Sequence, residues 1–272
     1  MAGVTPTRYR WGAIAWLLTL QFFVVETIAQ LQSGGSHSRA DDVISELGAS
    51  GAAAPLLMNA SFVVQGLLIG AGAVLLRPAL AGLGGRLVPA FLTAAAVGVV
   101  LVGLFPLDGQ EDLHQAGAGL HFVGGGLGLL AMAYAVRPRS EALGTVLAVL
   151  GLVSTAMTIF FALGVTSLGE GGTERAAAYP IPVGLAVAGA GLWWLGRRPE
   201  AEPRPSRREL RAQERAERAE RDRERDAALE AATTRPGPAR PPADPADTEP
   251  DDTEPDDDFD PEDPWARSRR RN

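Results

Sequence analysis

The chain has 272 residues with no cysteine, no lysine and a formal net charge of −7. Without cysteine it cannot form a disulfide framework, a thiolate metal site or a thiol nucleophile. Residues 201–272 hold 21 acids and 15 arginines, whereas residues 1–200 hold 11 acids and 10 arginines, so an apolar body is joined to a hydrophilic tail.

Six apolar segments are each long enough to cross about 30 Å of hydrocarbon at about 1.5 Å per residue. They occupy residues 11–31, 55–76, 87–105, 115–136, 142–165 and 180–196. A cleaved signal peptide is the alternative for the first segment, but its length, Glu26 and the spans that follow favour a membrane helix. The many glycines, such as Gly98 and Gly103, favour close helix packing in lipid. We predict an all-α, polytopic membrane protein with a six-helix transmembrane bundle.

The arginines of the short loops and chain ends predict an orientation. Eight of them lie in one set of segments, and only Arg39 and Arg175 lie in the alternating set. Because positive residues are concentrated on the cytoplasmic side, we predict that both termini are cytoplasmic. The expected location is the plasma membrane.

The composition changes from apolar to charged after the sixth span. Residues 207–232 are almost wholly Arg, Glu, Asp and Ala, with opposite charges four residues apart and no apolar seam, which predicts a solvated single helix. We therefore divide the chain into a transmembrane domain (1–198), a charged cytoplasmic helix with a proline-rich hinge (199–232) and a disordered acidic tail with a basic end (233–272).

Several charged or hydrogen-bonding side chains fall at one depth of the predicted bundle. A charge within a span is costly, so it usually faces a partner or a cavity. Glu26, Asn59 and His121 each lie roughly 6–9 Å below the external end of their span at about 1.5 Å per residue. Together with loop residues they form a candidate binding pocket, which consists of Glu26, Glu46, Asn59, Asp108, His114, His121, Glu174 and Arg175. The alternative is that these groups only join helices through hydrogen bonds.

The histidines raise the possibility of a metal site. His114 and His121 share a helix face but are separated by about 10.5 Å along the helix axis. Neutral imidazole, Asp108 and a third ligand such as Glu26 or His37 could form a three-ligand zinc site that activates water. We predict no cofactor and keep this zinc ion only as an alternative, and no Ser-His-Asp arrangement can be assigned from the spacing.

Three segments at external helix ends resemble the prokaryotic membrane family called domain of unknown function 998. They are ISELGASGAAAPLLMNASF (44–62), GLFPLDGQEDLHQAGAGLHF (103–122) and GGTERAAAYPI (171–181). The resemblance covers about residues 11–196 and implies a six-helix membrane domain of unassigned activity. The matching polar positions are Glu46, Asn59, Asp108, His114, Glu174 and Arg175.

A more distant similarity is to alkaline ceramidases and adiponectin receptors, which bind zinc through three histidines and use a nearby serine and aspartate. The present chain has six predicted spans rather than seven, and it has no closely spaced histidine pair on one helix.

Three classes of function remain open. The first is a membrane protein that binds membrane lipid or a small molecule in an outer-leaflet pocket. The second is a metal-assisted hydrolase of a lipid amide or ester, and the third is a transporter, although the spans show no evident inverted repeat. We predict no nucleic-acid partner, because the arginine-rich C-terminal end is expected to pair with the acidic stretch before it. The sequence names no partner for the tail.

Overall fold

The computed structural model describes residues 6–80, 82–165, 167–197 and 207–233. All the regular elements in these ranges are helical. The α-helices are α1 (Pro6–Leu18), α2 (Gln21–Gln32), α3 (Pro55–Leu76), α4 (Gly82–Leu104), α5 (Glu111–Val136), α6 (Glu141–Ala162), α7 (Glu170–Ala178), α8 (Pro180–Gly196) and α9 (Arg207–Thr233). Two short 3-10 helices, η1 (Ile44–Gly48) and η2 (Arg77–Ala79), flank α3.

Among the residues that the structure describes, six helical segments are long and apolar enough to cross a membrane. They are Thr7–Gln32, Pro55–Ala79, Gly82–Leu104, Glu111–Val136, Glu141–Ala162 and Glu170–Gly196. The first segment contains α1 and α2, and the last contains α7 and α8. The prediction of an all-α, multi-pass membrane protein with six spans is therefore confirmed.

Five of the six spans begin earlier than their apolar runs, and two of these earlier starts place predicted pocket residues on helices. Helix α5 begins at Glu111 and the last span begins at Glu170, so each has an acidic first turn. Acidic side chains stabilise the positive end of the helix dipole, but they lower the hydropathy from which the span was predicted. As a result, His114, Glu174 and Arg175, which were expected in loops, lie on helices.

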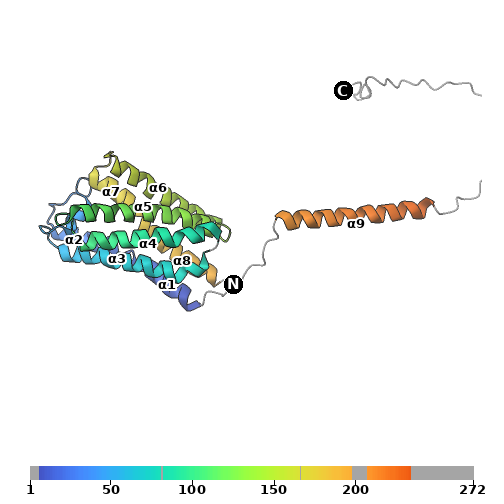
Figure 1. Cartoon of the computed structure of the whole chain (residues 1–272), viewed down its shortest axis with the longest axis horizontal. Helices are drawn as coiled ribbons and strands as arrows, with labels where there is room; N and C mark the ends of the chain where they lie inside the picture. The colour runs from blue at the N-terminus through green and yellow to red at the C-terminus, as the bar shows by residue number, and fades with distance from the viewer. Residues whose placement is uncertain (1–5, 81, 166, 198–206, 234–272) are drawn as a thin grey trace, which may run out of the picture. The chain divides into compact units, whose positions relative to one another are not determined.

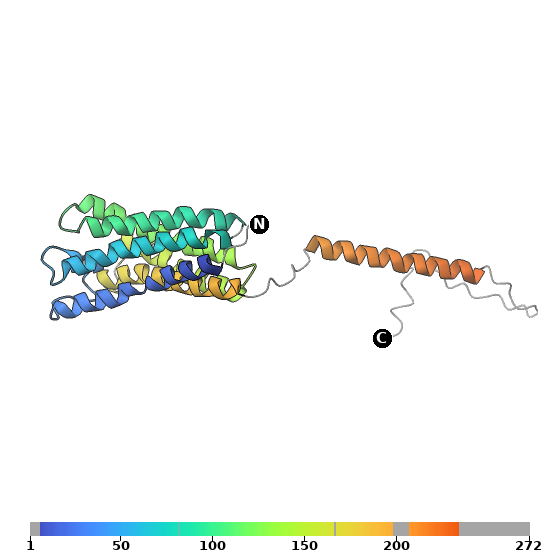
Figure 2. The same ribbon diagram turned by 90° about the horizontal axis from the view of Figure 1, so that it is seen from below.

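The spans lie side by side along a common direction (Figures 1 and 2), and their contacts close into a ring. Helix α1 packs on α3 and α8, α3 on α4, α4 on α5, α5 on α6, and α6 on both α7 and α8. Large apolar side chains such as Trp16, Leu92 and Leu129 are fully buried inside the ring. Others, such as Leu152 and Phe160 of α6, are exposed on its outer surface, where acyl chains can contact them.

Helices α4 and α5 approach each other through glycine. A Cβ atom built on Gly117 would lie 2.7 Å from the carbonyl oxygen of Gly98, and one built on Gly98 would lie 2.5 Å from the carbonyl oxygen of Gly117. The two backbones are therefore in direct contact at this level, and no side chain fits between them. Gly84 and Gly124 allow similar approaches along the same pair of helices.

The first and last spans are both interrupted, and the two interruptions lie against each other. Thr19, between the end of α1 at Leu18 and the start of α2 at Gln21, is fully buried. Its hydroxyl oxygen lies 2.5 Å from the carbonyl oxygen of Trp16 and 3.2 Å from that of Pro182 in α8. Polar backbone groups within a membrane must find partners inside the protein, and Thr19 provides one where the helices break.

Helix α9 confirms the predicted charged helix. Its described side chains, residues 210–231, are exposed, and Arg221 lies 4.0 Å from Glu217 one turn earlier. Internal contacts divide the chain into a unit of residues 1–203 and a unit of residues 204–272. Apart from Thr233, the predicted disordered tail lies outside the described residues, and the predicted domain boundaries stay predictions.

Candidate functional site

A buried ion pair joins the first and last spans. The Nε atom of Arg175 in α7 donates to the Oε1 atom of Glu26 in α2 at 2.9 Å, and these side chains are 6% and 1% exposed. The hydroxyl oxygen of Tyr179 lies 2.9 Å and 2.8 Å from the two carboxylate oxygens of Glu26. A buried carboxylate needs such partners, because leaving it alone in a medium of low polarity is strongly unfavourable.

The same guanidinium holds the segment that precedes η1. Its Nη1 atom lies 2.9, 2.7 and 3.1 Å from the carbonyl oxygens of Arg39, Asp42 and Gly171, and its Nη2 atom lies 3.0 Å from Nε2 of His37. Since a guanidinium nitrogen can only donate, Nε2 of His37 is the acceptor and its imidazole is neutral. Burial, followed by the positive charge of Arg175, lowers the pKa of His37, which agrees with this protonation state.

Glu174, the neighbour of Arg175, holds η1 itself. Its Oε2 atom accepts a hydrogen bond of 2.5 Å from the backbone amide of Ile44, while the amide of Gly172 donates to the carbonyl oxygen of Ala40 at 2.8 Å. A Cβ atom built on Gly171 would lie 2.1 Å from the carbonyl oxygen of Asp42, so only glycine permits this approach. We call the region formed by α2, residues 33–54, α7 and the adjoining loops the cap end of the bundle.

Two further predicted residues fasten other parts of the cap end. The Nδ2 atom of Asn59 in α3 donates to the carbonyl oxygen of Gly48 at 2.8 Å. The backbone amide of Ser50 donates to Oδ2 of Asp108 at 2.9 Å, and the Ser50 hydroxyl donates to the same oxygen. These hydrogen bonds lower the pKa of Asp108, the hydroxyl contributing most. Asp108 thus joins the α4–α5 loop to the segment between η1 and α3.

The two histidines of α5 each bond to the backbone of α4 or of the loop after it. The Nδ1 atom of His114 lies 2.7 Å from the carbonyl oxygen of Phe105, and that of His121 lies 3.0 Å from the carbonyl oxygen of Ala95. A carbonyl oxygen only accepts, so Nδ1 carries a proton in both imidazoles, and in the neutral form of such an imidazole the lone pair is on Nε2. His114, His121 and Asp108 do not form a cluster of potential metal ligands in the described part of the chain.

Within the described ranges, one group of three side chains could hold a metal ion: His37, Asp42 and Glu46, whose potential ligand atoms all lie within 4.8 Å of one another. Partial burial, followed by the charge of Asp42, raises the pKa of Glu46. However, Nε2 of His37 already accepts from Arg175 and its Nδ1 carries the proton, so the imidazole has no free lone pair. In this arrangement the imidazole of His37 is bonded to Arg175, and only the two carboxylates of the cluster are left as metal ligands. Two ligands are too few for a zinc site.

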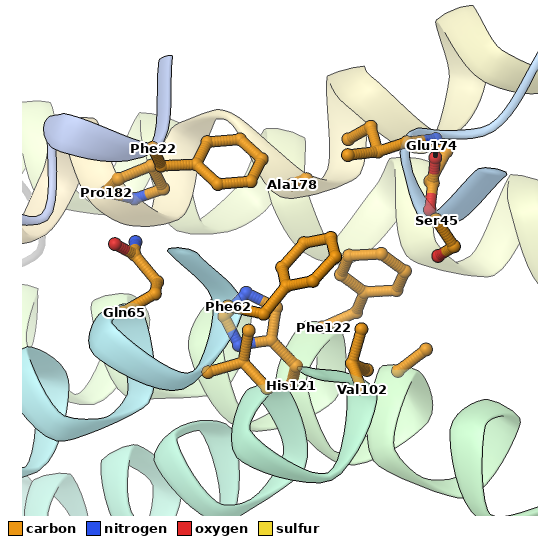
Figure 3. Close-up of a pocket in the computed structure, with 13 residues that line it drawn as sticks. Phe22, Ser45, Phe62, Gln65, Val102, His121, Phe122, Glu174, Ala178 and Pro182 are labelled. Carbon is orange, nitrogen blue, oxygen red and sulfur yellow. Dashed lines mark hydrogen bonds between the residues drawn. The ribbon is translucent and has the colours of Figure 1, made fainter. Parts of the chain in front are cut away.

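A narrow cavity of about 30 Å³ lies inside the bundle next to the cap end (Figure 3). Its wall is mainly apolar and consists of Phe22, Ile44, Ser45, Phe62, Gln65, Val99, Val102, Ala118, His121, Phe122, Glu174, Ala178 and Pro182. Two of the predicted pocket residues, His121 and Glu174, belong to this wall. The other six, Glu26, Glu46, Asn59, Asp108, His114 and Arg175, lie outside it.

The ion pair, the cap end and the cavity lie within a region that matches a known family. A family model described as "Protein of unknown function (DUF998)" matches residues 17–193. The chain belongs to this DUF998 family. The resemblance found in the three short segments is thereby confirmed, and the DUF998 region contains the ion pair, the cap end and the cavity. Neither a search of curated proteins nor a search of solved structures found a match.

Sequence reasoning missed two residues of the DUF998 region that the structure brings into the site. Gln65 of α3 is 2% exposed, lines the cavity and accepts from Nε2 of Gln21 at 3.4 Å. An amide within an apolar span is a signal that could have identified it, because such groups face a partner or a cavity. The sequence does not single out Tyr179 in this way, because its contact with Glu26 depends on how the first and last spans pack.

Proposed function

We propose that this DUF998 protein is a membrane protein that binds the apolar part of a lipid or of a small amphiphilic molecule in the cavity. The composition of the cavity wall supports this proposal, because phenylalanine and valine side chains surround the space and a few polar groups face it. Ligand sites have this composition, with polar groups that orient a mostly apolar molecule. Because the free space is narrow, such a ligand enters only when Phe22, Phe62 or Phe122 changes rotamer.

Filling the cavity tests this proposal. Ala118 of α5 lines the cavity, so Ala118→Leu is expected to abolish ligand binding by occupying the space. The measurement is native mass spectrometry of protein extracted from its own membranes and then delipidated in detergent. The wild-type protein is expected to retain a bound molecule of defined mass, and Ala118→Leu is expected to lose it.

Ala116 provides a matched control on the same helix. It lies two residues before Ala118 and is exposed, so Ala116→Leu makes the same chemical change without reaching the cavity. Ala116→Leu should retain the bound molecule. The proposal is wrong if the wild-type protein carries no such molecule, or if both variants retain it equally.

We propose further that both termini and α9 lie in the cytoplasm and that the membrane is the plasma membrane. The support is the excess of arginine at one end of the spans. Gln110 lies between α4 and α5, Glu141 lies at the start of α6, and both are exposed. In a chain without cysteine, Gln110→Cys is expected to react with an impermeant maleimide on intact cells, and Glu141→Cys only after permeabilisation. The opposite pattern would show that the termini face outward.

A further inference from the structure

The cavity wall contains two buried side chains that each have one polar atom without a hydrogen-bond partner among the described residues. Gln65 is 2% exposed, and its Oε1 atom accepts from Gln21, but no described residue bonds to its Nε2 amino group. His121 is 8% exposed, and Nδ1 is bonded to Ala95, whereas Nε2 has no partner among the described residues. Both side chains line the cavity, as Figure 3 shows.

The surrounding hydrogen bonds determine whether each unpaired nitrogen is a donor or an acceptor. Gln21 accepts from the hydroxyl of Ser61 through Oε1 and donates to Gln65 through Nε2, so the amide oxygen of Gln65 is occupied and its amino group remains as a donor. His121 carries its proton on Nδ1, so Nε2 remains as an acceptor. Buried polar groups nearly always have a hydrogen-bond partner, so a donor and an acceptor left open on one cavity call for an occupant.

The two groups lie at the same depth. Helices α3 and α5 both run inward from the cap end, and Gln65 and His121 each lie ten residues after the first residue of their helix. At about 1.5 Å per residue, both are roughly 15 Å from those helix starts.

We propose that Gln65 and His121 form a subsite for the hydroxyl group of an uncharged amphiphilic molecule, such as a long-chain alcohol. This inference rests on the proposed binding function of the cavity. A hydroxyl group accepts one hydrogen bond from Gln65 and donates one to Nε2 of His121. An ether oxygen accepts only, a hydrocarbon does neither, and an ionised headgroup would find no opposite charge at this end of the cavity. The apolar chain of the ligand then lies among Phe62, Val102 and Phe122.

The test compares 1-octanol with its methyl ether, which has a similar chain but no hydroxyl hydrogen. The protein is held in lipid nanodiscs and labelled with ¹⁵N-histidine and ¹³C-phenylalanine. With three histidines in the chain, the signals are assigned with a His121→Gln variant. Both probes are expected to shift phenylalanine signals of the cavity. Only 1-octanol is expected to shift the Nε2 signal of His121, with the His37 and His114 signals unchanged.

Two variants separate the subsite from the cavity. Gln65→Leu is expected to weaken the apparent affinity for 1-octanol about three- to ten-fold, the effect of one hydrogen bond, and to weaken the affinity for the ether as well, because the ether oxygen also accepts from Gln65. Gln32→Leu makes the same change at an exposed position and should alter neither affinity. Ala118→Leu should remove the response to both probes.

Two other results would contradict either the hydroxyl subsite or the proposed ligand binding of the cavity. If octanol and ether bind equally and neither shifts His121 Nε2, the hydroxyl subsite is wrong while the apolar cavity still binds ligands. If neither probe shifts any phenylalanine signal at saturation, the proposed function fails and the subsite fails with it. The comparison of the two probes on wild-type protein decides the question even if Gln65→Leu does not fold.

Discussion

Replacing Arg175 with methionine is expected to lower the stability of the membrane domain by about 3–5 kcal/mol, the usual cost of breaking a buried ion pair. The substitution leaves the carboxylate of Glu26, which is 1% exposed, with the hydroxyl of Tyr179 as its remaining partner. It also releases the carbonyl oxygens of Arg39 and Asp42 from the guanidinium. The expected readout is an earlier thermal melting transition of the purified protein in detergent.

A second substitution tests whether the loss comes from an uncompensated charge. Adding Glu26→Gln to Arg175→Met removes that charge, so the double variant should lose less stability than the two single changes added together. Arg137→Met is the control, because Arg137 and Glu141 are 3.5 Å apart with side chains 68% and 78% exposed. It should cost less than about 1 kcal/mol. Equal effects of Arg175→Met and Arg137→Met would show that the buried pair does not hold the cap end.

Replacing Gly117 with leucine is expected to cost about 3 kcal/mol, the upper part of the range for an overpacked interior. Its first side-chain atom would lie 2.7 Å from the carbonyl oxygen of Gly98, which is backbone and cannot rotate away. Helices α4 and α5 would have to separate, and with them the cavity wall that carries Val99 and Ala118. Thermal melting in detergent measures the loss.

Gly119 is the matched control for Gly117. It lies on the same helix, and a Cβ atom built there meets nothing within 4 Å. Gly119→Leu is expected to be neutral or slightly stabilising, because leucine favours the helix more than glycine by up to about 1 kcal/mol. If both variants melt alike, contact between α4 and α5 through glycine does not determine the packing of the ring.

The predicted pocket residues have two structural roles: some join parts of the cap end by hydrogen bonds, and some also line the cavity. Glu26, Asn59, Asp108 and Arg175 bond to other parts of the cap end, which is the role of joining helices and loops that was considered as the alternative. His121 and Glu174 also make such bonds but line the cavity as well. Six of the eight predicted pocket residues therefore lie outside the wall of this cavity.

The sequence by itself determined that the protein is an all-α membrane protein with six spans, a charged helix and membership of the DUF998 family. These properties depend on composition and length over 20 or so consecutive residues, so they can be read locally. The helix starts at Glu111 and Glu170 could not be read in this way, because polar first turns resemble loops in a hydropathy pattern.

The tertiary structure alone decided which side chains meet. Depth along a helix follows from counting residues, but the direction in which a side chain points follows from the rotation of each helix against its neighbours. That rotation brings Arg175 to Glu26 rather than to Asp108, and it turns His121 toward the cavity while His114 bonds to Phe105. It also exposes the amide of Gln65 to the cavity. Contacts between residues more than a hundred positions apart arise only when the ring of helices closes, and no local pattern encodes them.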